Sequence, residues 1–147
     1  MQANGNIRIA ASPETITAAL RDPAVLAAIL PACRGVTAQE RDAFTADFAR
    51  EVGRMRLGLS ARVRVAGEGA VQVLEIEGGN LLTGKIAARC DIRLAPRGAE
   101  TRLDWDGSVT LQGLLRKLAE TAAPGTADRV VSALFYRLKQ QLESRPA

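Results

Sequence analysis

The residues that most often carry out catalysis or bind metals are scarce in this sequence. Its 147 residues include no histidine, which excludes Ser-His-Asp and Cys-His catalysis, histidine-ligated metals and the usual proton shuttle near neutral pH. The two cysteines, Cys33 and Cys90, have no metal-ligand spacing and no histidine as a base, so we interpret them as small packing side chains. The sequence therefore predicts no catalytic residue and no metal site, and hence a protein that is not an enzyme.

Carboxylates and glycine-rich turns are the remaining candidates for chemistry. Glu75, Glu77, Asp104 and Asp106 alternate with apolar residues, so we expect them on the solvent-facing side of strands, away from the apolar surroundings of an acid–base catalyst. The pair at 78–79 does not stand between a strand and the start of a helix, as a phosphate-binding loop requires. We interpret it as part of a hairpin turn.

The rest of the sequence shows two periodicities. Apolar and polar residues alternate most clearly over residues 54–65, and again over 44–48, 86–94 and 103–111, with short glycine-rich or proline-containing turns between the runs; this is typical of half-buried antiparallel strands. Helical spacing follows Ser12-Pro13 and Asp22-Pro23 near the beginning, and returns over residues 127–142.

These elements predict an α+β protein with a helix-grip (START-like) fold. We expect a curved antiparallel sheet of about six to seven strands, two short N-terminal helices and a long C-terminal helix. No linker, internal repeat or low-complexity segment divides the sequence, so residues 1–147 are expected to form a single domain.

The inward rows of this predicted sheet mix large side chains with small ones such as Ala46, Ala61 and Gly107. Few bulky groups are available to fill the space beneath the last helix, which favours an apolar cavity. The alternative is that the leucines at 81–82 and 114–118 fill it, and the sequence leaves both open. Arg50, in phase with an inward row, is a candidate polar residue at the pocket mouth. The candidate ligand-binding residues are Phe44, Phe48, Leu59, Trp105, Leu118, Val130 and Leu134.

Charge and aromatic content bear on the partner. The net charge is +4, which is compatible with nucleic acid, an anionic membrane or an acidic protein. Phe44, Phe48, Trp105 and Phe135, four of the five aromatic residues, fall on inward rows or the helix stripe, so no base-stacking platform is available and no nucleic acid is expected. The first residues lack the basic and apolar regions of a secretory signal, which predicts a cytoplasmic protein.

Residues 13–33 are similar to the opening of the carbon monoxide dehydrogenase CoxG family, within the START-like (SRPBCC) superfamily. The segment contains Pro13, Leu20, Asp22-Pro23 and Cys33 at the family's spacing. The resemblance continues through the glycines at 78–79, the pair at 84–85 and residues 127–135. It departs from the family where Ile16-Thr17 replaces a Val-Trp pair and where alanine replaces the glycine before Cys33.

The resemblance implies a function as well as the fold. The family is associated with carbon monoxide dehydrogenase-like molybdenum hydroxylases, as an accessory that helps assemble the enzyme or brings it to the membrane, and START-like relatives commonly hold apolar molecules. It thus implies a non-catalytic accessory protein that binds a quinone or lipid between sheet and C-terminal helix, without another cofactor. Its partners would be a molybdenum hydroxylase and the inner face of the cytoplasmic membrane. Two alternatives are a cyclase/aromatase-like enzyme on the same fold and a purely protein-binding module with a filled core.

Overall fold

Seven strands and four helices make up the part of the chain that the computed structural model describes, residues 1–40 and 42–145. The elements follow one another as β1 (Gln2–Ile9), α1 (Pro13–Ala19), α2 (Pro23–Ile29), β2 (Cys33–Glu40), β3 (Ala43–Val52), β4 (Met55–Glu68), β5 (Val71–Asn80), β6 (Gly84–Arg97), β7 (Glu100–Gln112), α3 (Leu114–Glu120) and α4 (Thr126–Glu143).

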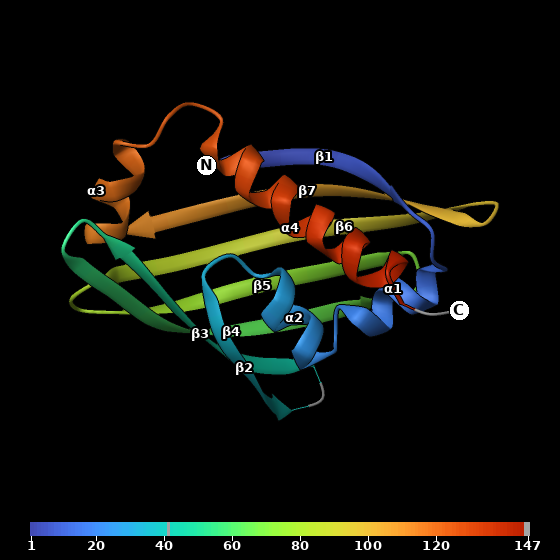
Figure 1. The fold of residues 1–147 in the computed structure, drawn as a ribbon, viewed down its shortest axis with the longest axis horizontal. Helices are drawn as coiled ribbons and strands as arrows, with labels where there is room; N and C mark the ends of the chain where they lie inside the picture. Colours follow the sequence, from blue (N-terminus) through green and yellow to red (C-terminus); the bar gives the residue numbers. More distant parts are fainter. Residues whose placement is uncertain (41, 146–147) are drawn as a thin grey trace.

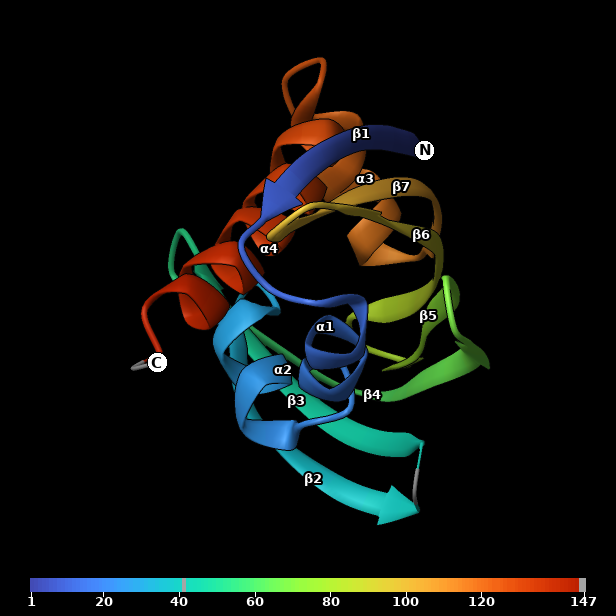
Figure 2. The ribbon, with the colours of Figure 1, turned by 90° about the vertical axis from the view of Figure 1, so that its right-hand side faces the viewer.

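The strands form one antiparallel sheet in the order β1-β7-β6-β5-β4-β3-β2. Strands β2 to β7 follow one another as hairpins, and β1 closes the sheet by pairing with β7, so that Gln2 lies opposite Ser108. Strands β4 and β6 each have 14 residues, and such long strands must twist. The sheet curves into an arc with the helices on its inner side (Figure 1, Figure 2).

The two short N-terminal helices begin where the sequence predicts. The Ser12 side chain accepts a hydrogen bond from the Thr15 backbone N–H at 3.1 Å, and the Asp22 side chain accepts one from the Ala24 N–H at 2.9 Å. In each helix a proline occupies the first turn, where its missing N–H costs nothing. The residues that α1 and α2 bury include Ile16 and Leu26, both fully buried, so these helices cover one end of the arc.

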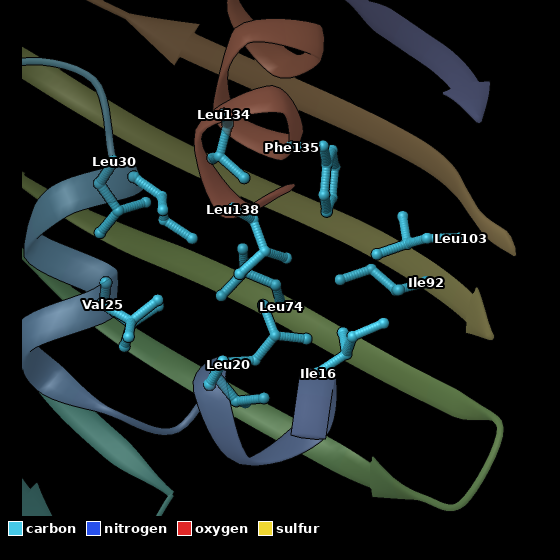
Figure 3. Close-up of a cluster of buried hydrophobic side chains, with 14 of the residues drawn as sticks. Ile16, Leu20, Val25, Leu30, Leu74, Ile92, Leu103, Leu134, Phe135 and Leu138 are labelled. Atoms are coloured by element: carbon cyan, nitrogen blue, oxygen red, sulfur yellow. The ribbon is translucent and has the colours of Figure 1, made fainter. Parts of the chain in front are cut away.

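Helix α4 supplies the central part of the core. Leu134, Phe135, Leu138 and Leu142 are buried along one face, and Figure 3 shows the first three pointing toward side chains of the sheet and of α1. Phe135 stacks on Trp105, with ring centroids 4.7 Å apart. On the neighbouring strand the Trp105 ring lies against Gly5, where a Cβ would overlap it.

The predicted α+β helix-grip fold is confirmed, with seven strands and a long C-terminal helix. One expectation about the interior is wrong: Leu81 and Leu82 do not fill it, because both side chains project into solvent at the β5–β6 turn.

Candidate functional site

The inner face of the sheet is not covered evenly. At the end that holds α1, α2 and the C-terminal part of α4, the inward residues are buried, as for Ile92 and Leu103 at 0% exposure. We call this region the closed half. Toward the opposite end the inward apolar residues are only partly buried, and we call that region the open half. The open half consists of Phe48, Leu57, Leu59, Ile86, Leu111, Leu114, Leu115 and Leu118.

The open half follows from how little of the sheet α3 covers. This helix has seven residues, none of them fully buried, and it packs on β6 and β7. On the other side of the arc, β4 pairs with β3 from Met55 onward but with β5 only from Ala61 onward. The inward side chains at this end of β3 and β4, Phe48 and Leu59, are therefore left half-buried.

Between the two halves runs a belt of small inward side chains. Cross-strand pairing aligns them: Ala3 lies opposite Gly107, Gly107 opposite Cys90, and Ala46 opposite Ala61. Small residues leave space above the sheet where Leu or Phe would fill it. We call these residues the small-residue belt: Ala3, Ala46, Ala61, Gly78, Ala88, Cys90 and Gly107.

Trp105, next to the belt on β7, has an unpaired polar atom. Its side chain is 6% exposed, and its Nε1 is the one buried side-chain nitrogen or oxygen without a hydrogen-bond partner among residues 1–40 and 42–145. A buried N–H without an acceptor costs free energy, about 1–3 kcal/mol in proteins. A ligand oxygen reaching this atom would remove that cost.

The two thiols are not poised for chemistry. Cys90 faces inward within the belt, and burial raises the pKa of its thiol from 9.0 to about 12. Burial also raises the pKa of Cys33 above its ordinary value. Since the thiolate is the nucleophile and the metal ligand, both cysteines are protonated near neutral pH.

The predicted site residues divide between the two halves. Phe44, Trp105 and Leu134 lie in the buried core, whereas Phe48, Leu59 and Leu118 lie in the open half. Val130 does not face the core: it is 39% exposed, and its neighbour Val131 packs there instead. The residues that sequence reasoning left out of the site are Leu57, Ile86, Leu111, Leu114 and Leu115, although alternation or helical spacing marked all five as inward.

Arg50 lies near the end of β3, opposite Leu57, and its side chain is exposed. It therefore stands at the rim of the open half and not inside a deep cleft beside a carboxylate. None of the open-half or belt residues is acidic, so the constellation that a cyclase-like mechanism would need is not formed by them.

Two open hollows, of about 310 and 400 Å³, lie on the outer face of the sheet. Polar residues such as Asn6, Asp104 and Lys85 line them. Neither lies between the sheet and α4, where the sequence predicts an apolar cavity. Within the described part of the chain, no group of three or more acidic or cysteine side chains is arranged to hold a metal.

Among the helices that the structure describes, none has the length and apolar character needed to cross a bilayer.

Solved structures with this architecture are similar over almost the whole chain. A conserved protein from Geobacillus kaustophilus superposes with a TM-score of 0.81 at 20% identity, covering 97% of this chain and 95% of the other. A START superfamily protein from Mycobacterium smegmatis gives 0.67 at 16% identity, with 97% of each chain covered. A STAR-related lipid transfer protein from Xanthomonas axonopodis gives 0.65 at 13%, covering 96% and 85%. These identities establish the START-like fold alone.

A comparison with curated proteins finds no match. The family comparison is informative: the model of the carbon monoxide dehydrogenase CoxG family matches residues 5–143, from the first strand to the end of α4. The residues matched thus include the sheet, the small-residue belt from Ala46 to Gly107 and the whole open half. This chain belongs to the carbon monoxide dehydrogenase CoxG family.

Proposed function

We propose that this protein is a non-catalytic accessory protein that binds an apolar ligand, a quinone or a lipid, in the open half of its grip. The observation that carries the proposal is the uneven burial of the inner face. In a filled core the inward leucines would be as buried as Leu103 is. Leu57, Leu59, Leu111 and Leu118 remain half-exposed on facing elements.

The unpaired N–H of Trp105 supports a ligand that has an oxygen acceptor. A quinone carbonyl or a lipid ester, entering along the small-residue belt toward the closed half, would approach Trp105 from the side of Gly107, its next inward neighbour on β7. Apolar contacts in the open half would contribute most of the affinity, while one hydrogen bond would set how deep the ligand lies.

Family membership supports the partner and the location. We place the protein in the cytoplasm, peripheral at the inner face of the membrane, where it supports a carbon monoxide dehydrogenase-like molybdenum hydroxylase or recruits it to the membrane. Both are inferences from the family. Their test is co-purification of the tagged protein with such a hydroxylase, where an absence of association contradicts the partner but not the ligand.

The ligand proposal is tested with the purified protein. Native mass spectrometry should reveal a bound apolar species, and the fluorescence of Trp105, the single tryptophan, should change on titration with a short-chain naphthoquinone or with lysophosphatidylcholine. Leu59→Glu, which places a charge in the open half, should weaken binding at least tenfold. Its matched control, Thr110→Glu on the outer face, should bind as the wild type does.

A second variant tests the hydrogen bond. Trp105→Phe keeps an aromatic ring against Phe135 but removes the N–H donor, so binding of the naphthoquinone, measured by calorimetry, should weaken about fivefold, in line with the loss of one neutral hydrogen bond of roughly 1 kcal/mol. If no species is bound and neither probe titrates, the ligand site is refuted. Hydroxylase binding that then depends on Leu114 and Leu115 would identify a protein-binding module instead.

A further inference from the structure

The turn between β5 and β6 presents two leucines to solvent. Leu81 is 102% exposed and Leu82 is 89% exposed, well above Met1 at 54%, the next large apolar side chain among those described. Single exposed apolar residues are normal on protein surfaces. Two adjacent leucines that both protrude beyond their surroundings form instead a small convex apolar tip, which we call the leucine tip.

Hydrogen bonds to the rest of the protein fix this turn in place. The Asn80 side chain accepts from the Thr83 N–H at 2.7 Å and donates to the Gly58 carbonyl at 3.1 Å. The Thr83 hydroxyl donates to the same carbonyl at 3.0 Å, and the Leu115 N–H donates to the Thr83 carbonyl at 3.0 Å. Strand β4 and helix α3 therefore hold the base of the turn, and the two leucines stand outward on a rigid support.

The leucine tip lies beside the open half. Gly58, which anchors it, stands between Leu57 and Leu59, and Leu115 belongs to the open half itself. Figure 1 shows the β5–β6 turn, the β3–β4 turn and α3 at the same end of the molecule. Whatever surface receives the tip therefore also comes to the rim of the proposed ligand site.

Cations predominate around this rim. Exposed basic side chains come from three elements: Arg54 and Arg56 at the β3–β4 turn and the start of β4, Lys85 on β6, and Arg116 and Lys117 on α3. The acidic side chains nearby are Glu51, opposite Arg56 on β3, and Glu120, which pairs with Arg116 at 3.4 Å. The rim therefore has a positive balance next to an apolar tip.

We propose that the leucine tip is a membrane anchor, which inserts into the interfacial layer of an anionic lipid bilayer while the surrounding cations meet lipid phosphates. This inference rests on the proposed function, since it names the source from which the open half would take its ligand. A tip of two side chains is far smaller than the roughly 800 Å² that each partner buries in a stable protein interface. A fluid bilayer receives a protruding apolar tip without a complementary shape, and anionic headgroups attract the basic rim.

Vesicle flotation tests the anchor with the full chain. The wild type should float with vesicles of three parts phosphatidylcholine to one part phosphatidylglycerol, less with phosphatidylcholine alone, and less at high salt because salt screens the charges. The double variant Leu81→Ser/Leu82→Ser should lose at least tenfold in partitioning. The matched control is Val71→Ser, which alters an exposed apolar residue at the start of β5, at the opposite end of that strand, and should stay within twofold of the wild type.

Several results would overturn the anchor: no flotation of the wild type, equal partitioning of the double variant, or a wild-type dimer that the double variant converts to monomer, which would make the tip an interface between copies. Titration with the short-chain naphthoquinone separates the two proposals. If the double variant still binds it but no longer floats, the tip acts in membrane binding alone. If the wild type floats but binds no probe, the ligand proposal fails and the anchor stands.

Discussion

The closed and open halves of the inner face share one sheet and the same alternation of apolar residues, yet only the closed half is packed. In the closed half, α1, α2 and the C-terminal part of α4 converge on Ile92, Leu103 and Leu74. In the open half the seven residues of α3 meet only part of the sheet, and Phe48 and Leu59 keep partial exposure. The closed half stabilises the fold, which leaves the open half available for a ligand.

The largest expected difference is in stability. Leu138→Ala removes a fully buried side chain of α4 and should lower the free energy of unfolding by about 2–5 kcal/mol. Leu118→Ala makes the same chemical change in the open half and should cost under about 1 kcal/mol, because its site is already partly hydrated. Urea denaturation of both variants measures this, and equal losses would show that the two halves are packed alike.

A smaller loss is expected from overfilling the closed half. Gly5→Ala places a methyl group where the Trp105 ring lies, so the ring or β1 must move, at a cost of about 1–3 kcal/mol. Gly35→Ala is the control, since a Cβ at Gly35 meets no atom within 4 Å. Thermal unfolding followed by Trp105 fluorescence distinguishes the two, and an unperturbed Gly5→Ala protein would contradict the close approach.

Cys90, at the boundary between the halves, predicts an alkaline limit to stability. Because burial raises its pKa from 9.0 to about 12, the folded state holds the thiol proton more tightly than the unfolded chain does. That contribution is present below pH 9 and is lost as the pH rises toward about 12. Urea denaturation on either side of pH 9 should show a steeper fall for the wild type than for Cys90→Ala; parallel curves would show that the thiol is hydrated.

The smallest effect concerns the end of α4 that closes the core. Glu143 accepts from the Lys139 ammonium at 2.7 Å and from the Ala10 N–H at 2.8 Å, and these bonds lower its pKa. The resulting stability is present above its ordinary pKa of 4.5 and is lost as the pH falls through the lowered value. Glu143→Gln should cost under about 1 kcal/mol at neutral pH and should flatten the acid limb of the stability curve. An unchanged acid limb would mean that the contact contributes nothing.

The sequence predicts local features of this fold well. Alternation from Met55 to Val65 identified β4 and its inward row, and Ser12-Pro13 identified the start of α1, because both signals depend on neighbouring residues. The same reasoning placed Arg50 at an edge, and its side chain is exposed at the end of β3.

Long-range features were beyond such reasoning. Helical spacing marks both Val130 and Val131, but only the seating of α4 on β1 decides that Val131 packs against the core. Hydrophobicity placed Leu81 and Leu82 inside, whereas the bonds from Asn80 and Thr83 to Gly58 turn them outward. The uneven covering of the sheet depends on where α3 ends its packing, which no local pattern encodes. Whether the predicted site residues bind a ligand stays a prediction.

The pairing of β1 with β7 has a consequence for how the chain folds. The first strand meets its partner only after about a hundred further residues have been made, and α4, which packs on β1, is later still. Contacts so distant in sequence slow folding. During synthesis the hairpins from β2 to β7 are available early, while β1 waits with an unpaired edge. The first strand should therefore be the last to dock, and the nascent chain should depend most on chaperones in that interval.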